Sequence, residues 1–123
     1  MTLAVYTAII GYPGEGRLDI SLRTGDKAFA PSRDIARQVR EGLDWKGYVE
    51  AYTQHMRLSY KSNRSIWDLV LASPRVVLCC YCPDPNRCHR TLLAKIFVRL
   101  GAKSHGEITE WDDTIEPPVF ARQ

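Results

Sequence analysis

The sequence has no long hydrophobic run and little excess of charge of either sign. No stretch of its 123 residues approaches the roughly 18 consecutive apolar residues of a membrane span, and the opening stretch MTLAVYTAIIGYPGEG lacks the basic flank of a signal peptide. The 17 basic and 14 acidic residues give a net charge of +3, which attracts phosphate-bearing partners mildly and is not a nucleic-acid-binding charge pattern. We therefore expect a cytoplasmic protein without a membrane partner.

Dispersed cysteines are also absent. All four cysteines fall within ten positions, at Cys79, Cys80, Cys82 and Cys88, whereas a small secreted scaffold spreads its cysteines along the chain. Structural disulfides are therefore not expected, and in a reducing compartment these side chains are thiols or metal ligands.

The sequence contains no internal repeat and no linker, and its 45% hydrophobic content is enough for one core. We predict a single domain over residues 1–123 with an extended tail from about residue 112.

The order of hydrophobic patterns predicts an α/β fold. Strands are predicted at residues 3–10, 17–22, 75–81 and 104–109. Helices are predicted at residues 33–42, 44–60, 63–73 and 88–102, with Ser32 and Asn63 as N-caps and Gly42 and Gly101 as stops. This order indicates a single layered domain whose mainly parallel sheet is flanked by helices. Because the strand at 75–81 is apolar on both faces, it is expected inside the sheet, covered on both sides.

Cys88, His89 and Arg90 open the helix that follows this buried strand. In an open α/β sheet, ligands sit at the carboxyl ends of strands beside helix amino-termini. The N–H groups and the dipole of the helix favour negative charge there, and Arg87 and Arg90 could add bidentate contacts to phosphate or carboxylate. The first hypothesis is therefore an enzyme for a phosphorylated or nucleotide-like small molecule, in which Cys88, as a thiolate, or His89 takes part in the chemistry.

The same segment supports other interpretations. Cys80, Cys82, Cys88 and His89 are suitable zinc donors, but two adjacent donors rarely point at one metal and the usual two-residue spacer is absent. No cofactor is therefore expected, with zinc as the alternative. A Cys82–Cys88 redox pair lacks the Cys-x-x-Cys spacing, and the spacing to the arginines does not fit the phosphate loop of tyrosine phosphatases. Buried thiols in a strand, with Cys79 and Cys80 as small hydrophobes, are also an adequate explanation.

Polar residues of the second predicted strand point to the same edge of the sheet. Asp19, Ser21 and Arg23 lie on one face of that strand. If it adjoins the cysteine strand, Asp19 orients a ligand or accepts a proton, and Ser21 and Arg23 contact the ligand together with Cys80. The competing interpretation of Asp19 is a capped or solvated strand aspartate.

Aromatic residues recur at helical spacing between residues 45 and 67. These residues, Trp45, Tyr48, Tyr52, Tyr60 and Trp67, could stack on bases as in single-strand binders, although such spacing is more typical of a hydrophobic core. Together with the segment EPPVF they suggest an alternative function, a noncatalytic module that binds nucleic acid or a protein. A homodimer is also left open.

The segment LCCYCPDPNRCHRTLLAKIFVRLGA resembles the signature of the family called domain of unknown function 488. The stretches VYTAIIG, LDISL and FAPS resemble earlier parts of that family, so the resemblance covers most of the chain. It implies a small cytoplasmic α/β protein of prokaryotes or their viruses, and it implies no particular reaction. Its motif selects Cys80, Cys88, His89 and Arg90, with Asp19. Cys79 and Cys82 look like local additions, which weakens a four-ligand zinc site.

Overall fold

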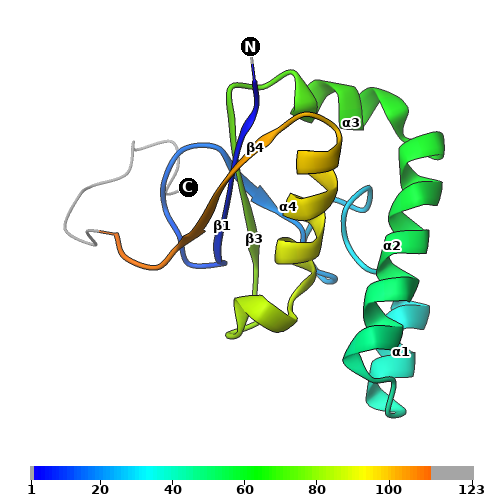
Figure 1. The fold of residues 1–123 in the computed structure, drawn as a ribbon. Helices are drawn as coiled ribbons and strands as arrows, with labels where there is room; N and C mark the ends of the chain where they lie inside the picture. The colour runs from blue at the N-terminus through cyan, green and yellow to red at the C-terminus, as the bar shows by residue number, and fades with distance from the viewer. Residues whose placement is uncertain (1, 112–123) are drawn as a thin grey trace.

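The computed structural model describes residues 2–111 (Figure 1), so the predicted tail from about residue 112 lies outside the described residues. The elements are β1 (Ala4–Ile9), β2 (Arg17–Asp19), α1 (Arg33–Arg40), α2 (Trp45–Ser62), α3 (Arg64–Leu71), β3 (Arg75–Cys80), the 3-10 turn η1 (Pro85–Arg87), α4 (His89–Arg99) and β4 (Lys103–Ile108). The predicted order of strands and helices is confirmed. Among the described residues, no helix is long and apolar enough to cross a membrane.

The helices begin and end at residues suited to those positions. The side chains of Ser32 and Asp44 accept backbone hydrogen bonds of 3.1 and 2.8 Å at the starts of α1 and α2. Gly42 and Gly101 follow the ends of α1 and α4 with φ values of +107° and +109°, which glycine adopts without strain. The predicted stops are therefore confirmed, and Asp44 is an additional cap.

One predicted cap is wrong. Asn63 makes no side-chain capping hydrogen bond at the start of α3. This residue also ends α2, and its amide donates back to Ser59 Oγ (3.2 Å) instead. Ser59 Oγ in turn donates to the Ala28 carbonyl (2.5 Å) and accepts from Trp67 Nε1 (3.1 Å). The junction of α2 and α3 is thus held by a buried serine rather than by a cap.

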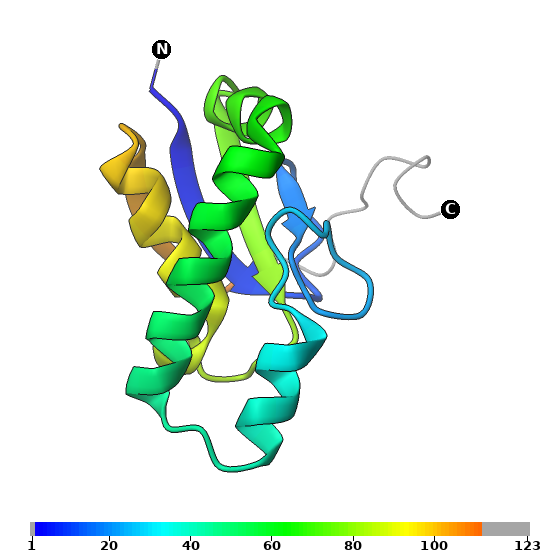
Figure 2. The same cartoon turned by 90° about the vertical axis from the view of Figure 1, so that its right-hand side faces the viewer.

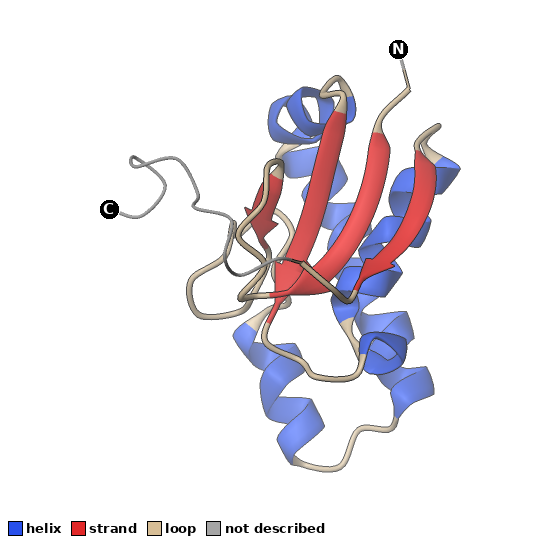
Figure 3. Ribbon diagram, turned by 90° about the vertical axis from the view of Figure 1, so that its left-hand side faces the viewer, coloured by secondary structure: helices blue, strands red, loops and turns tan. Residues whose placement is uncertain are grey.

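The four strands form one parallel sheet in the order β2-β3-β1-β4. The central strands β1 and β3 pair from Ala4 with Arg75 to Ile9 with Cys80. The carboxyl ends of these strands therefore finish at the same edge of the sheet (Figure 3). The interior position predicted for the apolar strand is confirmed, and it places Cys80 at that edge.

The second strand is shorter than predicted. It ends at Asp19 rather than at residue 22, because the Asp19 carboxylate accepts a hydrogen bond from Ser21 N (2.9 Å) and bends the chain. The turn is closed by hydrogen bonds from Gly25 N to the Ser21 carbonyl and from Asp26 N to the Asp19 carbonyl. Ile20 N still donates to the Cys79 carbonyl (2.9 Å), and the turn begins at Leu22. The predicted alternation fails at Ser21, which is buried, and at Leu22, which is exposed.

The four α-helices lie on one face of the sheet (Figures 1 and 2). The main hydrophobic core lies between these layers, and its largest members are Trp67, Tyr52, Phe29, Phe97 and Met56. On the other face, Val77 and Cys79 pack with Tyr12 from the loop after β1 and with Trp111. The sheet is therefore covered on both sides, as expected for an apolar central strand, but a loop provides the second cover.

Candidate functional site

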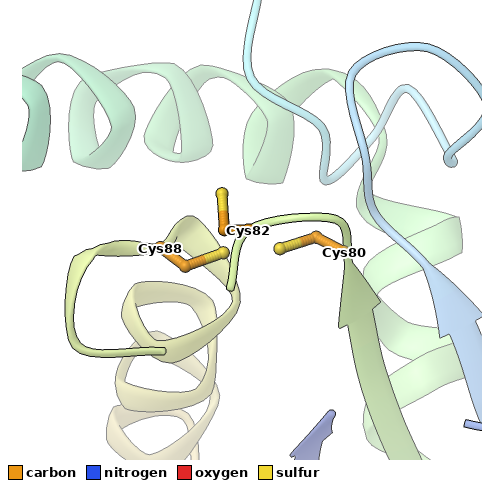
Figure 4. Close-up of side chains that lie close together, drawn as sticks. All are labelled: Cys80, Cys82 and Cys88. Atoms are coloured by element: carbon orange, nitrogen blue, oxygen red, sulfur yellow. The ribbon is translucent and has the colours of Figure 1, made fainter. Parts of the chain in front are cut away.

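Three cysteine side chains meet at the carboxyl edge of the sheet. The Sγ atoms of Cys80, Cys82 and Cys88 all lie within 4.8 Å of one another. Cys80 ends β3, Cys82 lies two residues later in the loop, and Cys88 directly precedes α4. Figure 4 shows the sulfur atoms of Cys80 and Cys88 pointing toward each other, with Cys82 beside them. The short segment therefore forms one compact thiol cluster.

Local hydrogen bonds fold the loop between β3 and α4 back on itself. The carboxylate of Asp84 accepts from Asn86 N (2.9 Å) at the start of η1, and Pro85 occupies the first position of that turn. The Thr91 hydroxyl, from the first turn of α4, donates to the Pro85 carbonyl (2.5 Å). The sequence DPNR thus brings Cys88 back toward the end of β3.

The three thiols differ in acidity. Hydrogen bonds from the thiols of Cys82 and Cys88 hold the pKa of Cys80 far below its ordinary value, although burial opposes this shift. The same contact with Cys80 raises the pKa of Cys82 and of Cys88. The sequence pattern suggested a thiolate at Cys88, which stays a prediction. The contact of Arg90 Nη1 with Cys80 Sγ (3.1 Å) favours a thiolate at Cys80, because a guanidinium group stabilises the charged form of the thiol beside it.

Arg90 is held inside the protein. Its side chain has no exposed surface, and its Nη1 atom donates to Cys80 Sγ (3.1 Å) and to the Cys82 carbonyl (2.8 Å). Its Nε and Nη2 atoms donate to the two carboxylate oxygens of Glu107 on β4, at 3.1 and 2.8 Å. The bidentate partner expected for Arg90 is therefore a side chain of this protein, and Arg90 positions the cysteines.

Glu107 was not singled out by the sequence. The last predicted strand, residues 104–109, has the sequence SHGEIT, in which polar residues outnumber apolar ones, so its hydrophobic pattern does not indicate which face points inward. The only available signal is the location of Glu107 near the carboxyl end of a parallel strand. Its Oε1 atom also accepts a hydrogen bond of 2.5 Å from the Thr7 hydroxyl on β1.

His89 is buried and neutral. Its Nε2 atom lies 2.6 Å from the Ile20 carbonyl, which can only accept, so Nε2 carries the hydrogen. Its Nδ1 atom therefore has a free lone pair and lies 3.8 Å from Cys88 Sγ. Burial lowers the pKa of His89. The three-thiol group does not include His89.

Asp19 organises the turn after β2. Its carboxylate accepts from Thr24 Oγ1 (2.5 Å) and from Ser21 N (2.9 Å). Burial acts to raise the pKa of Asp19, but these hydrogen bonds outweigh it and lower the pKa. Asp19 pairs with Cys79, so β2 does adjoin the cysteine strand as predicted. A role of Asp19 toward a ligand remains a prediction.

A cavity of about 540 Å³ lies beside the thiol cluster. Four of the predicted ligand-binding residues line it, namely Ser21, Arg23, Cys80 and Arg87. Cys82 and His89 also line it, whereas Cys88, Asp19 and Arg90 do not. The cavity thus joins the turn after β2 to the loop after β3, as the parallel order of the strands predicts.

The aromatic residues divide into core and cavity residues. Tyr52 and Trp67 are fully buried. Trp45 and Tyr48, at the start of α2, are half-buried, line the cavity and stack at 5.3 Å between ring centroids. Burial and the neighbouring cysteines raise the pKa of Tyr48, so its hydroxyl stays neutral. Trp45 and Tyr48 are therefore the two residues of this aromatic set whose rings can stack on a ligand in the cavity.

Comparison with known protein families gives a match, and it includes the Cys-His-Arg motif. A family model described as "Active DUF488-N3 subclade" matches residues 19–101, which is more than half of the chain. The chain belongs to the DUF488 family. The match begins at Asp19 and includes the Cys-His-Arg motif, while β1 and β4, with Glu107, lie outside it. No curated protein and no solved structure matches this DUF488 chain.

The DUF488 site combines groups with distinct chemical abilities. A thiolate is a nucleophile or a metal ligand. The exposed side chains of Arg23 and Arg87 can contact an anionic group at the cavity. The stacked rings of Trp45 and Tyr48 offer an aromatic face. The cavity volume is in the range of about 300–1,000 Å³ that is usual for small-molecule sites.

Proposed function

We propose that this DUF488 protein is an enzyme that binds a nucleotide-like anionic small molecule in the cavity beside Cys80. The observation that carries the proposal is the lining of that cavity, which brings aromatic rings, exposed arginines and cysteine sulfurs to one space. The description of the matched subclade as active supports an enzyme over a noncatalytic module.

The binding groups suit a ligand with a planar end and an anionic end. The Trp45 and Tyr48 rings are only 21° from parallel, and they are half-buried, so a flat heterocycle can extend the stack. Arg23 and Arg87 are exposed cations on the turn and the loop that line the cavity. Guanidinium groups bind phosphate oxygens in a bidentate manner. A phosphorylated nucleoside has both features.

Cys80 is the residue proposed to contact the reacting part of the ligand. It lines the cavity from the fixed end of β3, whereas Cys88 does not line the cavity. Cys88 and His89 would act through Cys80, because Cys88 contacts Cys80 and the Nδ1 atom of His89 lies 3.8 Å from Cys88 Sγ. In this proposal Arg90 fixes Cys80 and makes no contact with the ligand.

A thermal-stability screen tests this proposal. The protein is melted with nucleoside mono-, di- and triphosphates, with phosphorylated sugars and with a short single-stranded oligonucleotide. A ligand that binds the folded state at 100 times its Kd adds about 2.7 kcal/mol of stability. We expect nucleoside phosphates to raise Tm, and Trp45→Ala and Arg87→Ala each to weaken the best ligand about tenfold.

Arg64→Ala is the matched control. Arg64 is an exposed arginine on α3 whose partner is Asp68, and it does not line the cavity. Its loss should leave ligand binding unchanged. A wild type that no mononucleotide stabilises would contradict the proposal. Strongly salt-dependent binding of the oligonucleotide alone would favour the noncatalytic nucleic-acid module instead.

A further inference from the structure

We propose that Cys80, Cys82 and Cys88 bind a zinc ion as three thiolate ligands. The proposal rests on the geometry of the thiols and does not depend on the ligand proposed above. Their Sγ atoms lie within 4.8 Å of one another. At a Zn–S distance of about 2.3 Å, the sulfur atoms of a tetrahedral site lie about 3.8 Å apart. Each pair therefore has to close by at most about 1 Å, a movement that side-chain rotation can supply.

The backbone holds two of these thiols firmly and lets the third adjust. Cys80 is buried at the end of the central strand β3, and Cys88 is buried at the start of α4. Cys82 is half-buried in the loop between them. The two fixed donors define the site, and Cys82 completes it with little reorganisation of the chain. This adaptability matters because the Cys-x-Cys spacing differs from the usual two-residue spacer.

The surroundings compensate the charge of such a site. Three thiolates and one Zn²⁺ carry a net charge of −1. The guanidinium group of Arg90 donates to Cys80 Sγ (3.1 Å) and to the Cys82 carbonyl (2.8 Å), and Glu107 fixes its other nitrogens. Hydrogen bonds of this kind orient metal ligands. The amino-terminus of α4 adds a positive dipole next to Cys88.

The fourth coordination position faces the cavity in this proposal. Within residues 2–111 the donor group has three members. The Nδ1 atom of His89 lies 3.8 Å from Cys88 Sγ but is not within 4.8 Å of all three thiols, and its Nε2 atom is occupied by the Ile20 carbonyl. Cys79 packs on the other face of the sheet. Cys80 and Cys82 both line the cavity. Three protein ligands with an open position are typical of zinc sites that contact a substrate, whereas structural sites have four.

Metal analysis of the full chain tests this site. The tag-free protein is purified under reducing conditions and its zinc content is measured by mass spectrometry. The metal-free protein is then titrated with Co²⁺, which reports thiolate ligation by its charge-transfer absorption. We expect about one zinc per chain and stoichiometric cobalt binding. Loss of one ligand in Cys82→Ser or Cys88→Ser should weaken cobalt binding at least about tenfold.

Cys79→Ser is the matched control, since Cys79 adjoins Cys80 in sequence but lies on the opposite face, with its Sγ atom 3.5 Å from the Val77 carbonyl. It should bind cobalt as the wild type does.

Cys82 is half-buried, so Cys82→Ser tests the site even if Cys88→Ser fails to fold. Reduced wild type that takes up neither metal overturns the proposal, as does cobalt binding that Cys82→Ser leaves unchanged. Nucleotide binding without metal uptake would overturn only the zinc site, and metal uptake without nucleotide binding only the proposed function.

Discussion

Replacement of Glu107 by glutamine tests whether the burial of Arg90 depends on its carboxylate partner. The Arg90 side chain has no exposed surface, and the Glu107 side chain is 19% exposed. Glutamine keeps the size of the side chain and one acceptor oxygen, but it removes the negative charge that two guanidinium nitrogens contact. Removal of one partner from a buried ion pair costs about 3–5 kcal/mol. Because Glu107 retains some solvent contact and Arg90 Nη1 keeps two other acceptors, we expect a loss of about 2–3 kcal/mol.

Urea unfolding followed by tryptophan fluorescence measures this loss. The midpoint should fall while the slope m stays the same, because the surface exposed on unfolding does not change. In a domain of this size each 1 kcal/mol corresponds to roughly 3–5 °C in Tm, so Tm should fall by about 6–15 °C. Glu110→Gln, at an exposed site just beyond β4, is the control and should stay within about 0.5 kcal/mol of the wild type.

A Glu107→Gln protein as stable as the Glu110→Gln control would refute this reasoning. The charge of Arg90 would then be balanced by Cys80 rather than by Glu107. In that case β4 would contribute to the site only through its backbone pairing with β1.

Three further substitutions test the turn beside the cavity and the helical layer. Asp19→Asn should cost about 1 kcal/mol at neutral pH. Because the pKa of Asp19 is below its ordinary value of 3.8 in the folded state, this contribution is complete above the unfolded pKa and is lost as the pH falls through the folded one. Gly25→Ala should cost about 2 kcal/mol or more, since its Cβ would lie 2.4 Å from Ser21 N. Ser59→Ala should cost about 1–3 kcal/mol, since it leaves Trp67 Nε1 without its buried acceptor.

Each of these is measured by urea unfolding against a nearby control. An Asp19→Asn penalty that stays constant from pH 7 to acid would contradict the role given to the carboxylate. Gly11→Ala, where a Cβ meets nothing within 4 Å, should be nearly neutral, and an equal loss at both glycines would argue against crowding at Gly25. Ser62→Ala, on the exposed side of α2, controls for helix propensity, and a Ser59→Ala protein no less stable than it would remove the role of the Ser59 hydrogen bonds.

The order of elements could be predicted because its signals are local. Apolar runs, alternation and caps such as Ser32 depend on a few neighbouring residues, and β3 was marked as interior by its two apolar faces. The end of β2 was missed because the sequence alternates between apolar and polar residues as far as residue 22. In the structure the Asp19 side chain accepts a hydrogen bond from Ser21 N, and this contact ends the strand. The one-sided helical layer was not predicted, because it depends on packing between distant segments.

The candidate site was predicted in part for a related reason. Ser21, Arg23, Cys80 and Arg87 follow strands that end at one edge, so they line one cavity. The partner of Arg90 was missed because the orientation of Glu107 depends on an irregular register. The pairing of β1 with β4 shifts between Val5 and Tyr6, so that Thr7 lies opposite Glu107. A slip of one residue reverses the face to which a side chain points.

The central place of β1 has a consequence for synthesis on the ribosome. This strand is made first, yet its partners β3 and β4 follow only after three helices and after the motif, with Ala4 paired to both Arg75 and Lys103. Its apolar sequence AVYTAI therefore leaves the ribosome without a partner strand. Parallel pairing over such separations is slow and exposes apolar segments to aggregation. The nascent chain cannot build its sheet progressively, and Arg90 lacks its carboxylate partner Glu107 until the last strand docks.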